Sequence, residues 1–482
     1  MTPGRIASLT LGAALAFAAC SGGDDAASDG DPPATAATES NAAAVDTTPV
    51  TVTPGEFRSF GPAPEVPEGP LADDTVVAVD AFFDSLDSGV DYDALDVIRT
   101  SGDARLAWLV TDVLRFVGPG QIQDELRTTF EELTDTEVVV DRSVWGTTTD
   151  HLLAWDLPAP PGYVNWKAQV FTLIEPDWAP FFEDADATID WRWVSWGGVL
   201  IDDREIERTD SPCLASCIPA LNDPELTDAA GGDWYDDDRI VFGVVVGDEA
   251  VAFPKNIIEV HEMVNMTIGG RRIGMPYCTL CGSAQAYFTD DVIDADGVGP
   301  TYELRTSGLL SRSNKVMFEF HTRSVFDTFT GEAVVGPLRE AGVQLEEISV
   351  RTTTWGNWKE QHPDTRIVAE DGGLGRDYPE DPLRGRDDDG PIFPIGNVDP
   401  RLEVQAPVLG VVLDDGTPLA FPADAAEAVL AQGGDVTLAG VTLQLDAAGL
   451  VAVDGDGDPV AAHEAFWFAW SQFHPDTELW LP

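Results

Sequence analysis

Apolar residues in the segment 73–135 recur with the spacing of amphipathic helices. Three successive runs follow a 3.6-residue period, and they cover positions 76–86, 106–117 and 122–133. Gly118-Pro119-Gly120 separates the second run from the third, because glycine and proline end helices. The pattern therefore predicts a small antiparallel helical unit over residues 73–135, in which the apolar stripes pack against one another.

Short apolar runs, broken by Pro, Gly and Asp, replace this pattern after residue 138. Trp191-Arg192-Trp193 alternates in the manner of a half-buried strand, and Trp196-Gly197-Gly198 ends it. Tryptophans in such an alternating apolar context belong in a core more often than on a sugar-binding surface. We interpret residues 136–237 as a Trp-rich connecting region.

The chain from residue 239 onward has the hydrophobic pattern of β-strands. Positions 240–246 form a near-continuous run of apolar, mostly β-branched residues, which predicts a buried strand. Positions 254–264 predict a short helix with His261 among the residues along one side. This part of the chain is therefore expected to be β-rich, with short helices in its connections.

A Cys-x-x-Cys sequence, from Cys278 to Cys281, lies between two predicted strands at 272–277 and 284–288. Gly269-Gly270 makes a turn before the first of these strands. The cysteine pair is therefore expected at the tip of a hairpin rather than at the start of a helix.

Two stretches of the C-terminal half closely resemble earlier ones. The sequences VFGVV and AFP within 241–254 recur as VLGVV and AFP within 408–422. The pattern W-x-x-W-x-x-x-H-P-D-T begins at Trp355 and again at Trp467. Self-similarity of this kind predicts an internal duplication.

These patterns together predict an α+β fold, in which a small N-terminal helical unit precedes a β-rich domain built from the duplication. The first β-rich copy is assigned to residues 238–372 and a degenerate second copy to residues 373–482. Features that both copies keep, such as His362 and His474, are expected to be scaffold. The Cys-x-x-Cys sequence occurs in the first copy alone, which makes it a candidate for function.

The N-terminus resembles a bacterial lipoprotein signal. A positive charge precedes an apolar run at 6–16, and Ala18-Ala19-Cys20 follows as a small-residue cleavage site. The run is too short to span a bilayer as a helix. We predict a signal peptide over residues 1–19 and a lipid anchor on Cys20, with an ordinary secretory signal cut near Ala18 as the alternative.

Residues 20–72 are rich in Ala, Asp, Thr, Pro and Ser and contain few large apolar side chains. Such a segment cannot offset its ordering entropy by burial, so it is predicted to be a disordered acidic tether. We therefore expect an exported protein of the cell envelope, either lipid-anchored to the outer face of the membrane or secreted.

The 482 residues carry 85 Asp and Glu against 27 Lys and Arg, which gives a formal net charge of −58. This charge repels phosphate backbones and excludes nucleic acid as a partner. It also repels anionic lipids, so contact with the membrane must come from the lipid anchor. Because carboxylates are so frequent, two of them close together are no sign of acid–base catalysis.

Four of the five cysteines form two local pairs, and Cys20 is the fifth. Exported proteins enter an oxidising compartment in which disulfides persist. Cys213-x-x-x-Cys217 is therefore predicted to form a local disulfide that closes a loop.

Cys278 and Cys281 resemble one knuckle of a zinc site, in which Gly282 lets the backbone bend under the sulfurs. A tetrahedral site needs two further ligands. His261 is the first choice for a third ligand because it precedes the pair in the same copy and has no counterpart in the second copy. Met263 and the Cys213/Cys217 pair are weaker choices. Thiolate and imidazole ligands suit copper as well as zinc.

The same two thiols admit other interpretations. A dithiol/disulfide couple is one, although the residues after the pair lack the helix start that lowers the pKa of an attacking cysteine. A small disulfide with a structural role, or two buried thiols that only pack, is another.

A set of short motifs occurs together in this chain: DWAPFF from Asp177, DDRIVFGVV from Asp237, HEMVN from His261, YCTLCGS from Tyr277, TSGLL from Thr306, FTGEAVVGPL from Phe329 and WGNW with HPDT from Trp355. The combination resembles an uncharacterised prokaryotic family, domain of unknown function 3179, over roughly residues 170–482. The resemblance implies export and a shared architecture, and it brings no established reaction.

The chain departs from that family's usual polar and aromatic residues within the stretch 310–328. Arg312, His321, Val325 and Asp327 are among the replacements. If this stretch lines a pocket, we expect the ligand of this chain to differ.

We therefore expect an exported lipoprotein that holds zinc or copper through Cys278, Cys281 and His261, for binding, transfer or redox use. One alternative is a non-enzymatic surface module with structural cysteines, whose grooves bind a protein or a glycan. The other is a thiol-disulfide redox protein. The sequence assigns no catalytic residue.

Overall fold

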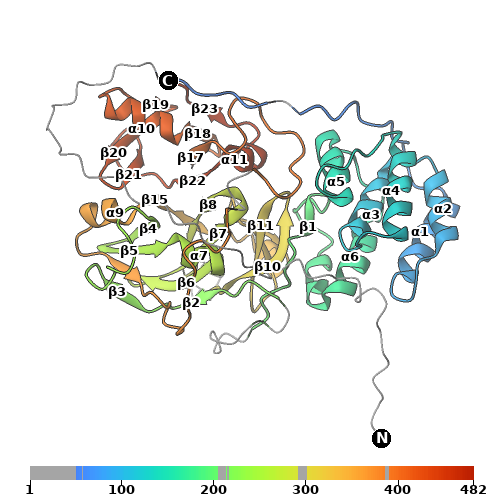
Figure 1. The fold of residues 1–482 in the computed structure, drawn as a ribbon, viewed down its shortest axis with the longest axis horizontal. Helices are drawn as coiled ribbons and strands as arrows, with labels where there is room; N and C mark the ends of the chain where they lie inside the picture. Colours follow the sequence, from blue (N-terminus) through green and yellow to red (C-terminus); the bar gives the residue numbers. More distant parts are fainter. Residues whose placement is uncertain (1–49, 57, 205–212, 214–215, 291–300, 386–389) are drawn as a thin grey trace, which may run out of the picture.

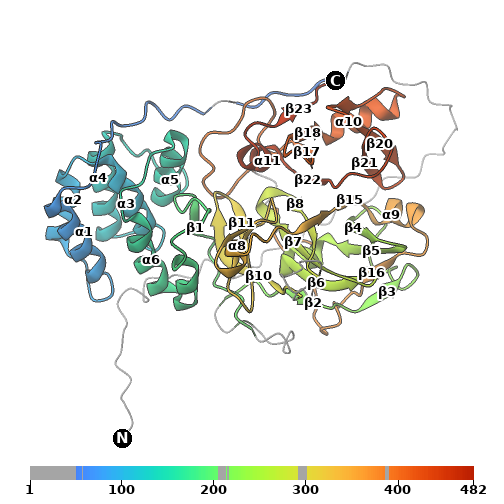
Figure 2. The ribbon, with the colours of Figure 1, turned by 180° about the vertical axis from the view of Figure 1, so that it is seen from behind.

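The computed structural model describes residues 50–56, 58–204, 213, 216–290, 301–385 and 390–482. The predicted signal peptide, the predicted anchor at Cys20 and the first part of the tether lie outside the described residues. The N-terminal helices gather at one end of the molecule, and the sheets, with the later helices among them, lie at the other (Figure 1, and from behind in Figure 2). No helix in the described part of the chain combines the length and the hydropathy of a membrane span.

The N-terminal helices share one apolar core, which also reaches the nearest β-sheet. The side chains of Asp91 and Ser143 accept the N–H groups of Ala94 and Gly146 and so cap two of these helices. The helices are α1 (Asp73–Ser85), α2 (Tyr92–Thr100), α3 (Ala107–Leu114), α4 (Gln121–Thr134), α5 (Val144–Trp155) and α6 (Tyr163–Ile174), with 3-10 turns at Ala104–Leu106 and Pro176–Phe182.

The helical unit extends beyond residue 135, which corrects the interpretation of residues 136–237. Helices α5 and α6 occupy much of that region, and Trp191–Trp193 is a turn that precedes strand β1 (Val194–Trp196). Threonines and aromatic residues of modest helix propensity fill both helices and obscured their period. Of the tryptophans in the alternating pattern, Trp191 is buried in this core, whereas Trp193 and Trp196 pack against it and are partly buried.

The β-rich part contains five sheets among the described residues, and each is named here by a central strand. The β10 sheet consists, in spatial order, of β1, β10 (Leu304–Ser311), β11 (Asn314–Glu319), β12 (Val325–Asp327) and β13 (Ala333–Val335). The β7 sheet consists of β14 (Glu346–Ile348), β9 (Ala286–Phe288), β7 (Arg271–Cys278), β6 (Met263–Ile268) and β2 (Leu221–Asn222), with β8 (Ser283–Ala284) paired to β7. Helix α7 (Lys255–His261) leads into β6, and α8 (Pro337–Glu340) follows β13.

Two of the remaining three sheets, the β4 and β17 sheets, carry the repeated sequences. The β4 sheet consists of β15 (Arg351–Thr354), β4 (Ile240–Val246), β5 (Glu249–Pro254), β16 (Arg366–Val368) and β3 (Leu226–Asp228). The β17 sheet consists of β22 (His463–Phe466), β17 (Pro407–Val412), β18 (Pro418–Pro422) and β23 (Glu478–Leu479), and the β20 sheet of β19 (Thr437–Leu438), β20 (Val441–Asp446) and β21 (Gly449–Val453). Helices α9 (Trp355–Gln361), α10 (Ala423–Ala431) and α11 (Trp467–Phe473) connect these strands. The predicted mixed α+β class is confirmed.

The β4 and β17 sheets have the same strand order and directions over four strands. In each, a hairpin is flanked on one side by an antiparallel strand and on the other by a parallel one. The helix α9 joins β15 to β16, and α11 joins β22 to β23 in the same way. The two repeated sequences therefore occupy matching places.

One glycine–tryptophan contact recurs in both sheets. A Cβ added to Gly243 would overlap the ring of Trp358, and a Cβ on Gly410 would overlap the ring of Trp470. Trp358 Nε1 donates to Thr365 Oγ1 at 2.8 Å. Both tryptophans are 0% exposed, so the repeated motif is a packing device of the core.

Edge strands β15 and β22 bring the two sheets together. The N–H of Val350 donates to the carbonyl of Ala462 at 3.1 Å, and Arg351 pairs with Asp446 at 2.8 Å. Polar side chains as well as backbone groups therefore join the C-terminal sheets to the first part of the β-rich region. Figure 1 shows β15 and β22 where the two parts meet.

Residues 50–56 and 58–72 run along the surface and contact both ends of the molecule, which corrects the predicted tether for these residues. The N–H of Gly55 donates to the carbonyl of Pro400 at 3.0 Å. Further along, Phe60 packs edge-on against His151 of α5, with ring centroids 5.3 Å apart. Val50 and Val52 are apolar residues that pack on the C-terminal core, an anchoring that composition alone does not reveal.

Replacing Gly243 by alanine should destabilise the fold by about 1–3 kcal/mol, because the added methyl group overpacks against Trp358. Urea unfolding measures the loss. Gly455→Ala is the matched control, since nothing lies within 4 Å of an added Cβ there. Equal losses in the two variants would contradict the packing argument.

Stability should also depend on pH through Glu464 of β22. Burial, with repulsion from Glu427 and Asp424, raises the pKa of Glu464 to about 8 from an ordinary 4.5. At pH values between 4.5 and about 8, Glu464 keeps its proton in the native state but has lost it in the unfolded chain. The free energy of unfolding therefore falls as pH rises through this range. Glu464→Gln, which cannot titrate, should lose part of this decline.

The measurement is urea unfolding of both proteins at several pH values between about 5 and 8. The variant should gain stability relative to the parent as pH rises. A difference that stays constant over this range would argue against a protonated Glu464 in the native state.

Candidate dithiol site

The Cys-x-x-Cys sequence forms the tip of a hairpin, as predicted. Strands β7 and β8 pair antiparallel, with Cys278 opposite Ser283. A 3-10 turn at Thr279–Cys281 connects the strands, and Gly282 closes the turn with φ of 57°. A side chain at Gly282 would be strained in this left-handed conformation, and its Cβ would lie 2.9 Å from the ring of Phe466.

Both cysteines are free thiols, and they are 2% and 0% exposed. Their sulfurs share a neighbour, because Cys278 Sγ and Cys281 Sγ lie 3.8 and 3.5 Å from the carbonyl oxygen of Ser313. The thiol of Cys281 is also hydrogen-bonded to the sulfur of Cys278. The two sulfurs therefore form a close pair.

The two thiols differ in acidity. Burial raises the pKa of Cys278, but hydrogen bonds from the thiol of Cys281 and the N–H of Lys315 outweigh it, so that the pKa lies below its usual value. Burial and the adjacent Cys278 raise the pKa of Cys281 well above its usual value. Cys278 is thus the sulfur that carries negative charge more readily.

A buried ion pair adjoins the thiols. Lys315 Nζ lies 3.7 Å from Glu262 Oε2, contacts the backbone carbonyl of Glu262 and donates to Thr306 Oγ1 at 3.3 Å. Thr279, within the cysteine turn, donates to Glu262 Oε1 at 3.1 Å. Burial lowers the pKa of Lys315 and raises that of Glu262. The opposite charge of each group partly offsets the effect of burial on the pKa of the other.

Glu262 adopts φ of 51° at the end of α7, a conformation that is uncommon for residues other than glycine. The surrounding contacts must hold it there, and those with Lys315 and Thr279 contribute. We call Cys278, Cys281, Glu262, Lys315, Ser313 and Thr279 the dithiol site.

The C-terminal β17 sheet covers the dithiol site. Cys278 and Cys281 belong to the same apolar cluster as Trp467, Phe468 and Trp470. Burial of the thiols thus depends on residues about 190 positions later in the chain than the hairpin.

The structure does not bring His261 to the two sulfurs. His261 Nδ1 lies 2.7 Å from the carbonyl oxygen of Pro219, and Nε2 lies 2.6 Å from the hydroxyl of Tyr378. Burial lowers the pKa of this histidine to about 4, so it is neutral. Met263, the weaker choice, packs in a different apolar cluster from the cysteines.

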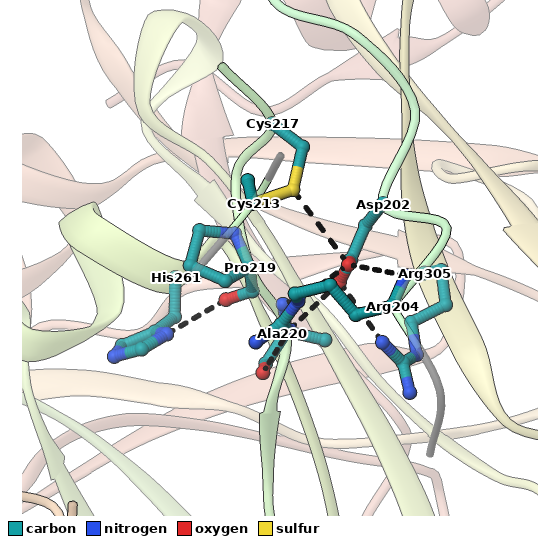
Figure 3. Close-up of a disulfide and its surroundings, with 8 residues drawn as sticks. All are labelled: Asp202, Arg204, Cys213, Cys217, Pro219, Ala220, His261 and Arg305. Carbon is teal, nitrogen blue, oxygen red and sulfur yellow. Dashed lines mark hydrogen bonds and ion pairs between the residues drawn. A yellow bond between two sulfur atoms is a disulfide. The ribbon is translucent and has the colours of Figure 1, made fainter. Parts of the chain in front are cut away.

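The predicted disulfide between Cys213 and Cys217 is present. Figure 3 shows it above Asp202, with Cys217 Sγ 3.7 Å from Asp202 Oδ1. Among the described residues, Asp202, Cys213 and Cys217 are the only group of three or more His, Cys, Asp or Glu residues whose possible metal-ligand atoms all lie within 4.8 Å of one another.

This set has no free ligand atoms for a metal in the oxidised state. The sulfurs are bonded to each other, and the carboxylate of Asp202 accepts from Arg204 at 2.6 Å and from Arg305 at 3.1 Å. The N–H of Ala220 donates to it as well, at 2.8 Å. Despite burial, these donors hold the pKa of Asp202 below its usual value.

The sequence reasoning missed Glu262, Lys315 and Asp202. A signal for Lys315 was available, because the chain has only four lysines, and a rare lysine in an apolar stretch suggests a buried partner. Glu262 follows His261 directly in the sequence. The prediction therefore chose the correct segment of chain but the wrong residue, because Glu262 and not His261 contacts the cysteine turn.

The scaffold histidines of the repeated turns pack on the repeated tryptophans. The rings of His362 and Trp358 lie 4.2 Å apart, and those of His474 and Trp470 lie 4.3 Å apart. This matching environment agrees with a structural role for both.

Replacing Lys315 by methionine should destabilise the protein by about 3–5 kcal/mol, because it leaves Glu262 buried without its cation. The double variant Lys315→Met/Glu262→Gln should recover much of the lost free energy of unfolding, because no charge is then left buried. Lys359→Met is the matched control, since Lys359 pairs with Asp237, whose side chain is 72% exposed, and should cost less than about 1 kcal/mol. Chemical denaturation of the four proteins measures the pattern, and additive losses in the double variant would contradict the pairing.

Comparison with known protein families finds a match that covers the dithiol site. Residues 215–449 match the family described as "Protein of unknown function (DUF3179)", a stretch that includes the whole dithiol site and the β4 sheet. No curated protein and no solved structure matches the chain. This match agrees with the predicted resemblance to the same family over residues 215–449.

Proposed function

We propose that the protein binds one soft monovalent metal ion, copper(I), between the thiolates of Cys278 and Cys281. The observation that carries the proposal is the pair of free, adjacent sulfurs at the hairpin tip. Soft thiolate ligands favour copper(I), and this ion accepts two of them without further ligands.

Coordination number decides between copper and zinc. A structural zinc site needs four ligands, and in the described part of the chain no third Asp, Glu or His ligand atom joins the two sulfurs within 4.8 Å. A ligand set that includes His261 would require its ring to leave Pro219 and Tyr378. The two-sulfur arrangement favours the ion with the lower coordination number.

The surroundings of the sulfurs support a bound ion. Two thiolates out of water need a compensating positive charge, and the copper ion supplies one unit of it. The ammonium of Lys315 also acts on Cys278, although Glu262 is its ion-pair partner. The apolar cover from Trp467 and Phe468 keeps water from the site.

We further propose that the protein acts outside the cytoplasm as a lipoprotein anchored through Cys20. The disulfide between Cys213 and Cys217 supports an oxidising compartment, because such bonds are rare in the cytosol. The protein then holds copper at the membrane surface.

We also infer that the β4 and β17 sheets arose by internal duplication. Their common strand order and the paired contacts of Gly243 with Trp358 and of Gly410 with Trp470 support this inference. The second copy lacks the cysteine pair and instead covers that of the first copy.

A reversible disulfide between Cys278 and Cys281 is the second candidate function. The hydrogen bond between the two sulfurs favours it. Their burial weighs against it, because a macromolecular exchange partner has no access to sulfurs that are 2% and 0% exposed.

Copper(I) added without oxygen to the reduced mature protein should bind at one ion per chain and remain after desalting. Cys278→Ser or Cys281→Ser should abolish this binding, whereas His261→Gln should retain it. Elemental analysis and competition with a copper(I)-specific chelator measure both. Cys213→Ser/Cys217→Ser is the control for cysteine loss elsewhere.

Other outcomes decide between the alternatives. Zinc at one ion per chain that is lost in His261→Gln would restore the three-ligand site and overturn the two-thiolate proposal. Absence of metal, with Cys278 and Cys281 joined in the protein as purified under air, would favour the redox or structural role.

A further inference from the structure

The disulfide between Cys213 and Cys217 adjoins two segments that lead to the dithiol site. The first is the chain at Asp202, whose Oδ1 lies 3.7 Å from Cys217 Sγ (Figure 3). The second is the chain at Pro219, which follows Cys217 after one residue. From each segment a series of contacts reaches Glu262, the carboxylate that accepts from the cysteine turn.

The series through Asp202 ends at the buried ion pair. The N–H of Asp202 donates to the carbonyl oxygen of Thr306 in β10 at 3.0 Å. The hydroxyl of the same threonine accepts from Lys315 Nζ at 3.3 Å, and this ammonium lies 3.7 Å from Glu262 Oε2. Asp202, Thr306 and Lys315 are all buried. Such a series has little room to absorb a shift at one end, because protein interiors are closely packed.

The series through Pro219 is shorter. The carbonyl oxygen of Pro219 lies 2.7 Å from Nδ1 of His261, a buried residue (Figure 3). Glu262 is the next residue along the chain. The N–H of Ala220 donates to the carboxylate of Asp202 at 2.8 Å, which joins the two series beside the disulfide. The segment next to the disulfide therefore reaches Glu262 both through the residue before it and through its ion-pair partner.

Left-handed backbone conformations occur at both ends of these contacts. Ser216, which lies between the two cysteines, has φ of 44°, and Glu262 has φ of 51°. Such conformations are uncommon for residues other than glycine, and they persist where the surrounding structure holds them. The carbonyl oxygen of Ser216 accepts from the N–H of Leu200 at 3.2 Å, and the disulfide joins the chain on either side of it. Loss of the disulfide therefore removes one constraint on a strained turn.

We propose that the Cys213–Cys217 disulfide is a positioning element of the dithiol site and makes this site sensitive to reduction. An external dithiol supplies two electrons and two protons, which break the S–S bond and leave a thiol on each cysteine, while the dithiol becomes a disulfide. Cys213 and Cys217 are partly exposed, whereas Cys278 and Cys281 are buried, so the reductant reaches the disulfide first. The loosened contacts then let the cysteine turn open more often.

Alkylation by iodoacetamide under native conditions tests this role without copper. Cys278 and Cys281 are the free cysteines of the described residues, and mass spectrometry of the full-length mature protein locates the modification on them. Cys213→Ser/Cys217→Ser, the serine variant, cannot form the bond and therefore represents the reduced state. Its alkylation rate at Cys278 and Cys281 should be at least about fivefold that of the parent, the size of a modest coupling between sites.

Arg339→Gln is the matched control for a general loss of stability. Arg339 pairs with Asp184 at 2.6 Å, and both residues lie outside the contacts between the disulfide and Glu262. Urea unfolding gives the stability of each variant. The control should keep the alkylation rate of the parent. An equal rise in the control, or no rise in the serine variant, would overturn the proposal.

His261→Leu tests the series through Pro219, because it removes the contact of the ring with that carbonyl oxygen. This change alone should also raise the alkylation rate. Combined with the serine variant, it should raise the rate by less than the product of the two separate effects, because both changes act on one series of contacts. Effects that simply multiply would overturn the argument that the disulfide acts through this segment.

The effect on copper rests on the proposed function, and copper(I) competition measures it separately. The serine variant should bind one ion per chain with a Kd about fivefold higher than that of the parent, because its sulfurs are less well positioned. A parent that binds no copper would refute the proposed function, and the alkylation rates would still decide the role of the disulfide. Equal Kd values together with equal alkylation rates in the two proteins would overturn that role.

Discussion

The contact between the β17 sheet and the β7–β8 hairpin determines the environment of the two free thiols. Cys278 and Cys281 share an apolar cluster with Trp467, Phe468 and Trp470 of α11, and Gly282 of the hairpin lies against the ring of Phe466 in β22. Within this cluster the sulfurs are buried, and every charge beside them needs a partner. The chemistry of the first β-rich segment thus depends on the segment that lacks cysteines.

The buried cations of the chain likewise depend on specific partners. The chain has 85 acidic residues and 27 basic ones, yet it buries some of its few cations. Lys167 is 0% exposed and Lys315 is 3% exposed, and each has a carboxylate partner. A buried pair contributes little net stability but is costly to break, so such pairs specify one arrangement of elements. Lys315 thereby ties the end of α7 to β11 beside the cysteine turn.

Periodicity and repetition allowed the general architecture to be predicted. The hairpin tip at Cys278, the disulfide at Cys213 and the mixed α+β class follow from local signals, namely turn residues, cysteine spacing and apolar period. Helices α5 and α6 were missed because β-branched and aromatic residues weaken the helical signal, and here tertiary packing outweighs propensity.

The ligand set was harder to predict, because it depends on contacts between residues distant in the sequence. His261 lies close to the hairpin in the chain, but hydrogen bonds with Pro219 and Tyr378, which are 42 and 117 positions away, hold its ring. No local pattern contains this information. The same holds for Lys315, whose partner Glu262 lies 53 positions away in sequence.

The turn between β10 and β11 connects the dithiol site to the helical unit. Arg312 extends from it toward the helical unit, and the next residue, Ser313, places its carbonyl oxygen against both sulfurs. Arg312 has a left-handed φ of 54° and lies one peptide bond from the contact that positions the thiols. A substitution that changes the backbone of this turn would therefore affect both the helix–sheet junction and the carbonyl oxygen that the sulfurs share.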